Sequence, residues 1–263
     1  MSDQQQPTQP PAPDAEVTAA VLVIGDEILS GRTKEANAGY IAEILTASGI
    51  RLREVRVVGD DEEEIVDALN ALRSRYTYVF TTGGIGPTHD DITAESIATA
   101  FGVGIDVDER ALDLMRPYYE SRGIELTPSR LRMARIPHGA ELIKNRITAA
   151  PGFRLQNVFV LAGVPSIMQV MFDAVLPHLR TGQKMLSETI RVAAPEGDIA
   201  DLFTEHAGEH PGVSMGSYPS FADGKMRCEL VLRSIDAQKL TAALSALQQK
   251  LEESGIPHTV SNA

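Results

Sequence analysis

The chain has 263 residues, of which 43% are hydrophobic, and a formal net charge of −12. This charge disfavours a dedicated nucleic-acid-binding protein, since no basic face offsets the backbone phosphates. The single cysteine, Cys228, excludes an intramolecular disulfide and a cysteine-based zinc site. Because the sequence has no 18-residue apolar run and no secretory signal pattern, we expect a cytoplasmic protein without a membrane partner.

The first 16 residues are rich in Gln and Pro and predict a disordered tail. Strands and helices are then expected to alternate. Strands are predicted over Thr18–Ile24, Arg51–Val58 and residues 76–80, and helices over residues 37–47, 61–74 and 94–101. Such alternation predicts an α/β fold with a parallel sheet covered by helices.

The next segment is predicted to hold a helical insertion over residues 108–122 and a short helix over 128–134. A buried strand over 157–161 and a helix over 166–179 follow, and Gly182 marks a boundary. After residue 183 the pattern predicts strands at Leu186–Val192, 213–218 and 226–232, a turn at 222–224, and helices at 198–209 and 240–251. We therefore expect two domains, residues 17–182 and a small α+β domain of βαββα order over residues 183–263.

A glycine-rich loop, Thr82-Gly83-Gly84-Ile85-Gly86-Pro87-Thr88-His89-Asp90-Asp91, follows the third predicted strand and precedes a helix. Glycine amides can approach an anion closely, and the helix N-terminus adds a positive dipole end. Adjacent carboxylates suit a divalent cation that bridges to phosphate, or a general base. We expect a branched side chain at Gly84 to enter the space that a phosphate needs.

The other strand ends also carry glycine, and most carry carboxylates. Gly25-Asp26-Glu27 follows the first strand, Gly59-Asp60-Asp61 the second, and Gly163 the strand at 157–161. The carboxyl ends of parallel strands share one edge of a sheet, where α/β proteins bind ligands. The joint placement therefore predicts one site at this rim.

Several of these residues have simpler explanations. A role as the cap of the next helix alone is an alternative explanation for Asp60 or Asp61 and for Asp91 or Thr93, and Ser166 with Gln169 matches a capping box. No helix is expected to start directly after Asp26 and Glu27, so a capping role does not explain them. His89 is either a ligand contact or a solvated loop residue. The five other histidines lack metal-ligand spacing and are expected at the surface.

The sequence contains no GxxxxGK[ST] loop, no complete dinucleotide fingerprint and no GxSxG elbow, which disfavours P-loop, Rossmann and α/β-hydrolase functions. The rim motifs instead resemble the molybdopterin-binding domain of Mog/MoaB-type proteins and gephyrin. The resemblance is strongest to the subgroup with competence/damage-inducible protein A (CinA) and the N-terminal domain of FAD synthase. It covers roughly residues 18–180 and includes Asn145, Ala150-Pro151-Gly152-Phe153 and Ala162-Gly163-Val164-Pro165-Ser166. Ile85 matches the FAD synthase-type loop, whereas the molybdenum-cofactor proteins carry threonine there.

The resemblance implies a three-layer α/β sandwich, a homo-oligomer and a small-molecule ligand, either a nucleotide or a pterin such as molybdopterin. It implies that Asp60 and Asp91 are catalytic, and Asp26, Asp90 and Asp91 are candidates to hold Mg²⁺ or Co²⁺. The candidate ligand-binding residues are Gly25, Ser30, Asn37, Thr82, Gly83, Gly84, Gly86, Thr88, His89, Thr93, Gly163, Pro165 and Ser166.

Two functions stay open at this point, and a third, an interaction module that retains the fold without a ligand, is disfavoured by the intact Asp26, Asp60 and Asp91. The subgroup implies metal-dependent hydrolysis of a nucleotide pyrophosphate, ADP-ribose or FAD, and the wider family implies a non-catalytic molybdopterin-binding or carrier protein. The amidase domain of full-length CinA is absent from this sequence, so deamidation is not expected.

Overall fold

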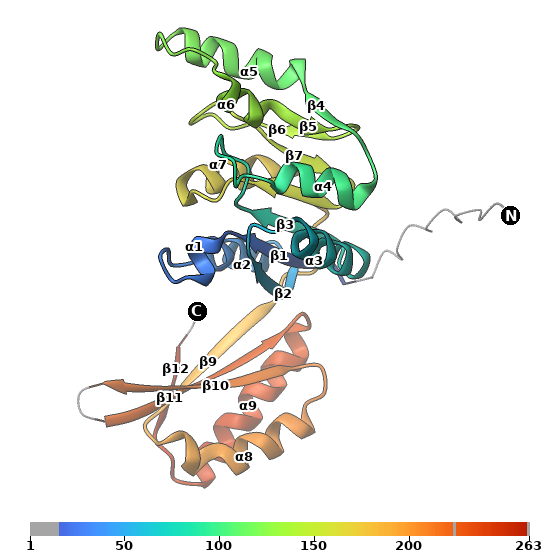
Figure 1. The fold of residues 1–263 in the computed structure, drawn as a ribbon. Coiled ribbons are helices and arrows are strands. Elements are labelled where there is room, and N and C mark those ends of the chain that lie inside the picture. The colour runs from blue at the N-terminus through green and yellow to red at the C-terminus, as the bar shows by residue number, and fades with distance from the viewer. Residues whose placement is uncertain (1–15, 223–224, 262–263) are drawn as a thin grey trace, which may run out of the picture. The chain divides into compact units, whose positions relative to one another are not determined.

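The computed structural model describes residues 16–222 and 225–261. The chain divides into two compact units, Met1–Gly182 and Gln183–Ala263 (Figure 1). The expected N-terminal tail, apart from Glu16, and the turn residues 223 and 224 lie outside the described residues. Within the described part of the chain, every helix is too short or too polar to cross a membrane.

A six-stranded sheet of order β2-β1-β3-β8-β7-β6 forms the centre of the first unit. Its strands are β1 (Thr18–Ile24), β2 (Arg51–Val58), β3 (Tyr78–Thr82), β6 (Glu141–Ile143), β7 (Gly152–Leu155) and β8 (Val158–Leu161). The first four in spatial order are parallel, while β7 and β6 are antiparallel. The mostly parallel sheet of the prediction is confirmed.

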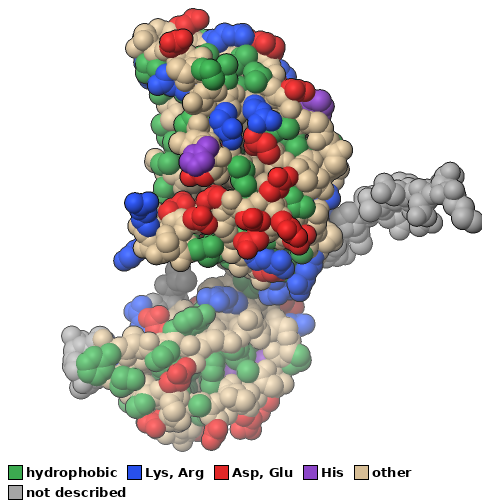
Figure 2. All heavy atoms as spheres, in the orientation of Figure 1, with side chains coloured by type: hydrophobic (Ala, Val, Ile, Leu, Met, Phe, Trp, Pro, Cys, Tyr) green, Lys and Arg blue, Asp and Glu red, His purple; other side chains and the backbone are tan. Residues whose placement is uncertain are grey.

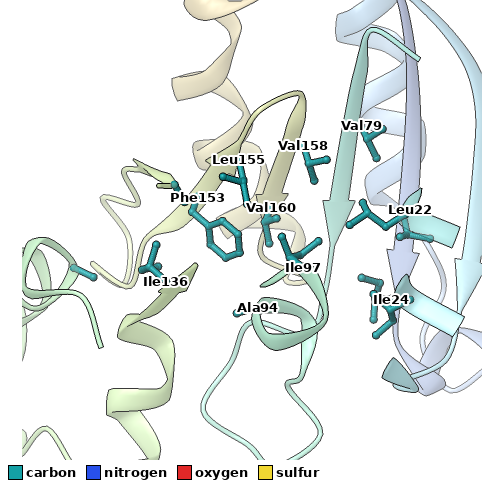
Figure 3. Packing of buried hydrophobic residues seen from close by; sticks show 14 of the residues in the cluster. Leu22, Ile24, Val79, Ala94, Ile97, Ile136, Phe153, Leu155, Val158 and Val160 are labelled. Atoms are coloured by element: carbon teal, nitrogen blue, oxygen red, sulfur yellow. The ribbon is translucent and has the colours of Figure 1, made fainter. Parts of the chain in front are cut away.

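Helices cover both faces of this sheet, which gives three layers (Figure 1). On one face, α3 (Glu62–Arg75) and α4 (Thr93–Phe101) pack their apolar side chains against alternate residues of the strands. Figure 3 shows Ile97 of α4 among Val79, Val158 and Val160 of the sheet. On the other face, α2 (Asn37–Ala47) and α7 (Pro165–Val175) bury a separate cluster around Phe80, Phe159 and Phe172.

The third strand and the loop after β1 differ from the prediction. β3 begins two residues later than expected and includes Thr81 and Thr82, whose β-branched side chains suit a strand and are buried. A one-turn helix, α1 (Asp26–Leu29), starts directly at Asp26, where we expected none.

The insertion after α4 holds the expected helices and two short strands that the sequence did not predict. α5 (Glu109–Glu120), α6 (Pro128–Leu131) and the 3-10 turn η1 (Arg132–Ala134) fall in the predicted segments. A two-stranded ladder of β4 (Ile105–Val107) and β5 (Arg135–Pro137) closes the insertion. Apolar residues of α5, such as Met115, join the cluster that α3 and α4 share.

The second unit is an antiparallel sheet of order β10-β11-β9-β12 that packs against two helices. Its elements are β9 (Leu186–Val192), α8 (Glu196–Glu209), β10 (Ser214–Ala222), β11 (Lys225–Ser234), α9 (Ala237–Glu253) and β12 (His258–Ser261). A 3-10 turn, η2 (Leu176–His178), ends the helical segment of the first unit. The α+β prediction is confirmed, but β12 makes the order βαββαβ. Leu240, Leu247 and Leu251 of α9 are fully or almost fully buried against the sheet.

Candidate functional site

The ends of four parallel strands meet at one edge of the first sheet. Ile24 pairs with Val58, Val23 with Thr82, and Thr82 with Leu161. The four loops that follow these residues therefore emerge side by side, as the sequence predicted. The chain runs from β1 to β2 on one side and later to β3 on the other, so the rim lies at a topological switch point.

Close contacts within the rim exclude a side chain at Gly83 and Gly84. Gly83 has φ +103°, and a Cβ there would lie 2.0 Å from the carbonyl oxygen of Ile24. A Cβ on Gly84, at φ +65°, would lie 2.1 Å from Thr93 Oγ1. Our expectation for Gly84 therefore needs correction, because a side chain there meets Thr93 before it meets any ligand.

Gly163 and Gly86 also leave little room for a side chain. A Cβ on Gly163 would lie 3.1 Å from the Cα of Gly83, and one on Gly86 would lie 2.6 Å from Asp91 Oδ2. The loops after β1, β3 and β8 thus pack backbone to backbone at Gly83 and Gly163, whereas Gly84 and Gly86 face side chains of Thr93 and Asp91. The amides of Gly84, Ile85 and Gly86 still donate no hydrogen bond to any described residue, so they remain available to an anion.

Asp26 and Asp60 form a reciprocal pair that ties the first loop to the second. The amide of Asp26 donates to Asp60 Oδ2 over 3.0 Å, and the amide of Asp60 lies 3.4 Å from Asp26 Oδ1. Burial raises the pKa of Asp60, and the charges of Asp26, Glu27 and Asp90 raise it further, although the hydrogen bond from Asp26 opposes them. Asp60 is thus a carboxyl group in a crowded negative field, which suits a general base or a cation site.

Capping separates Asp60 from its neighbour. Asp61, not Asp60, is the N-cap of α3, and it accepts a hydrogen bond from the amide of Glu64 over 3.0 Å. Asp60 accepts instead from the start of α1. Asp61 therefore caps α3, whereas Asp60 links the loop after β2 to the start of α1.

Asp91 holds its own loop. Its Oδ2 accepts from both the amide and the hydroxyl of Thr88, and its backbone oxygen accepts from Arg132 over 3.1 Å. It does not cap α4, which has no side-chain cap. Asp90 is exposed, and its Oδ1 lies 3.8 Å from Nδ1 of His89. The His89 side chain is 98% exposed. His89 is therefore a solvated loop residue in this structure.

Asn37 and Thr82 each carry a buried polar atom that has no partner among the described residues. Asn37 is 7% exposed at the start of α2, and its Nδ2 donates to the Gly163 carbonyl over 2.7 Å, while its Oδ1 has no partner. Thr82, 1% exposed, likewise has an unpaired Oγ1. Unpaired buried polar groups are costly, and these two atoms are positions where a bound ligand can form hydrogen bonds; Thr81 Oγ1 of β3 is unpaired as well.

The remaining predicted residues divide by exposure. Thr93 is fully buried and donates from Oγ1 to the Gly83 carbonyl over 3.0 Å, so it locks the glycine loop and caps nothing. Gly25 is buried between β1 and α1. Ser30, Pro165 and Ser166 are exposed on the rim. Ser166 forms no capping box, because Val164 holds the N-cap position of α7 and no side chain caps it.

The predicted metal ligands do not converge. Asp26, Asp90 and Asp91 do not bring three carboxylate oxygens within 4.8 Å of one another, and the described residues hold such a group only elsewhere. Asp26 and Asp60 are the two rim carboxylates that the structure links directly, each through the backbone amide of the other. Acidic side chains gather on the face of the first unit that Figure 2 presents.

Two arginines that lie beside the glycine loop were not predicted from the sequence. Arg132 and Arg135 come from η1 and β5, and with Gly84, Gly86 and Asp91 they line a hollow of about 10 Å³. Both ion-pair with Glu95, and Arg132 Nε is buried without a partner among the described residues. Such a hollow holds about one water molecule and is too small for an organic ligand.

The histidine prediction fails at one position. His206 on α8 is fully buried, although we expected it at the surface. It stands at i, i+3 and i+4 spacing with Glu209 and His210, and one ligand atom from each of the three lies within 4.8 Å of the others. That helical spacing is visible in the sequence and is the signal that would have identified the group.

Comparison with known proteins matches both units. The family described as "Probable molybdopterin binding domain" matches residues 20–181, and the FAD synthase middle domain matches residues 184–260. A protein of Aeropyrum pernix is 34% identical over 244 residues, which cover 88% of this chain and 91% of that protein. A CinA-like protein of Desulfosudis oleivorans is 35% identical over 209 residues, or 75% of this chain and 51% of that protein.

Among solved structures, the protein CinA of Thermoplasma acidophilum, described as of unknown function, is similar. It is 36% identical with a TM-score of 0.58, and the match covers 62% of this chain and 98% of that chain. The family match covers more than half of the residues and includes the whole rim. The chain therefore belongs to the molybdopterin-binding domain family, in its CinA-like branch, with a unit of the FAD synthase middle-domain type after it.

Proposed function

We propose that the rim binds a phosphorylated nucleotide and hydrolyses its diphosphate bond with the help of a divalent cation. The observation that carries this proposal is the placement of the Asp26–Asp60 pair at the same strand edge as the unpaired amides of Gly84–Gly86. Amides of this kind hold diphosphate oxygens, and a carboxylate beside them can activate water. ADP-ribose and FAD are the substrates that we propose.

Each group has a distinct part in this reaction. The loop amides donate hydrogen bonds to the diphosphate. Asn37 Oδ1 accepts a hydrogen bond from the rest of the ligand, and the Thr82 hydroxyl donates or accepts one. Asp60, whose pKa is raised, takes the proton from water as the water oxygen bonds to phosphorus and the bridging P–O bond breaks. A bound Mg²⁺ or Co²⁺ would polarise the diphosphate and offset its charge. Asp91 positions the loop through Thr88.

The matched pair Asp60 and Asp61 gives the test. Purified protein is incubated with ADP-ribose or FAD and with Mg²⁺ or Co²⁺, and the products are identified by mass spectrometry. Asp60→Asn is expected to lower turnover by at least about 10²-fold, a typical contribution of a general base. Asp61→Asn is expected to keep turnover, since Asn also caps helices well. A wild-type protein that releases no nucleotide monophosphate contradicts the enzyme proposal.

A second candidate is a non-catalytic molybdopterin-binding protein. The observation that favours it is the failure of Asp26, Asp90 and Asp91 to converge on one cation position. In that case molybdopterin binds with measurable affinity in calorimetry, neither substrate is hydrolysed, and Asp60→Asn changes affinity alone. Molybdopterin with ATP is therefore included in the same product assay.

A further inference from the structure

A second ligand site is suggested by the C-terminal end of α8, far along the chain from the rim residues. His206, Glu209 and His210 each direct one candidate ligand atom into a group whose atoms lie within 4.8 Å of one another. The rings of His206 and His210 have centroids 4.4 Å apart. Two imidazoles and a carboxylate form a donor set that zinc and related metals prefer over Mg²⁺ or Ca²⁺.

The hydrogen bonding of His206 prepares it for such a role. Its Nε2 lies 3.0 Å from the carbonyl oxygen of Ala243 on α9, and because a carbonyl only accepts, Nε2 carries the hydrogen. The lone pair then belongs to Nδ1, which is buried and has no partner among the described residues. A backbone carbonyl on the far nitrogen is the arrangement that orients metal-binding histidines in proteins.

The tautomer of His206 also fits. A metal binds the lone pair of a neutral imidazole nitrogen, and the hydrogen bond to Ala243 leaves that lone pair on Nδ1. An ordinary core histidine would place both nitrogens on partners, whereas this one is fully buried with Nδ1 unpaired.

Glu209, the carboxylate of the group, already forms an ion pair with a lysine. Lys250 Nζ on α9 is 2.8 Å from Glu209 Oε2. The hydrogen bond to Glu209 and the negative charges of Glu209, Glu205 and Glu253 raise the pKa of Lys250, so three carboxylates interact with this one ammonium group. A metal ion at Glu209 would take the place that the ammonium now holds.

We propose that His206, Glu209 and His210 form a binding site for one divalent transition-metal ion, Zn²⁺ or a metal of similar preference, with water completing the coordination. Tetrahedral ligands at about 2.0–2.1 Å from zinc lie roughly 3.3 Å apart. The group needs only a modest contraction, and Glu209 and His210 can supply it because neither is buried. Binding separates Glu209 from Lys250.

The test is a zinc titration of the untagged full chain by competition with a chromophoric chelator. We expect one equivalent of zinc per chain, and at least about a 10-fold weaker affinity in His210→Ala and in Glu209→Gln. His178→Ala, at an exposed histidine of the first unit, is the matched control and is expected to bind zinc as wild type does. His206→Ala is avoided, because loss of a buried, hydrogen-bonded ring can unfold the unit.

Lys250→Met gives an outcome of the opposite sign. Removal of the competing ammonium is expected to strengthen zinc binding, whereas a simple structural ion pair predicts no change. Asp60→Asn separates this site from the rim, and it is expected to leave the tight equivalent intact. The proposal is overturned by the absence of stoichiometric binding, by wild-type affinity in His210→Ala, or by loss of the equivalent in Asp60→Asn.

Discussion

The substitution Asp60→Asn is expected to stabilise the protein while it lowers turnover by at least about 10²-fold. Asparagine keeps an oxygen that accepts the Asp26 amide, which now bonds Asp60 over 3.0 Å. It removes a charge that lies in the field of Asp26, Glu27 and Asp90. Gains from relieving surface charge are about 0.5–2 kcal/mol, and since Asp60 is half-exposed and screened by solvent we expect the lower part, about 0.5–1 kcal/mol.

The sign follows from the raised pKa. A carboxyl whose pKa is higher in the folded state penalises folding while it is ionised. The penalty is therefore present above the folded-state pKa and disappears as the pH falls towards the unfolded-state pKa of about 3.8. The advantage of Asp60→Asn is therefore expected at pH 7 and is expected to shrink as the pH approaches 4. It is also expected to fall at high salt, because the repulsion is screened.

Thermal unfolding followed by calorimetry measures the effect. For a unit of this size, 0.5–1 kcal/mol corresponds to a rise in Tm of about 1–4 °C. Asp61→Asn is the control with the same chemical change on the adjacent residue. It keeps the cap of α3 but loses a favourable charge at the helix N-terminus, so its Tm is expected to fall slightly. A Tm that falls in Asp60→Asn, or a gain that persists unchanged at pH 4, refutes the reasoning.

Three further predictions concern the architecture of the first unit. Gly83→Ala is expected to lower the free energy of unfolding in urea by at least about 3 kcal/mol, because its Cβ would lie 2.0 Å from the Ile24 carbonyl oxygen. The control Gly102→Ala, at φ +64° with open space around it, is expected to lower it by only about 1–2 kcal/mol. Equal losses in the two variants would contradict the clash at Gly83. Asn145→Ala is expected to cost about 2–4 kcal/mol, because this buried amide bonds the backbone on both sides of the β6–β7 turn, and a cost below 1 kcal/mol would argue against that role. A chain that ends at Gly182 is expected to unfold in one cooperative calorimetric transition, and a broad non-cooperative trace would show that the first unit depends on the second.

The layered fold was predictable because its main elements carry strong local signals. β1 is a continuous apolar run buried on both faces, and α3 has an aspartate cap and an apolar stripe. The short strands β4, β5, β6 and β7 were not predictable, since three or four residues are too few for an alternation pattern. Their pairing depends on distant partners that no local pattern reveals.

The rim was predictable in position but not in detail. Strand-end loops of a parallel sheet must share an edge, so the grouping of Asp26, Asp60 and the glycine loop followed from the order of elements. The role of each glycine did not follow, because the atoms that exclude a Cβ, such as the Ile24 carbonyl at Gly83, come from other loops. Arg132 reaches the rim from an insertion about 40 residues downstream of Asp91 and could not be assigned for the same reason.

For the proposed metal site on α8, by contrast, the sequence does contain a signal, although our prediction placed these histidines at the surface. His206, Glu209 and His210 have a spacing that places them on one helical face. The sequence alone could not show that His206 is buried or that Ala243 fixes its tautomer. Burial and the partner of the second nitrogen are what distinguish a ligand from a surface histidine.

The most direct test of the central claim is the crystal structure of the Asp60→Asn protein soaked with ADP-ribose. The account predicts that the diphosphate lies within hydrogen-bond distance of the amides of Gly84, Ile85 and Gly86, with the ligand reaching Asn37 Oδ1. It also predicts that a divalent ion, when added, lies beside Asp26. Diphosphate bound away from the glycine loop, for example in the larger hollow beside Asp106 and Arg110, would contradict the account.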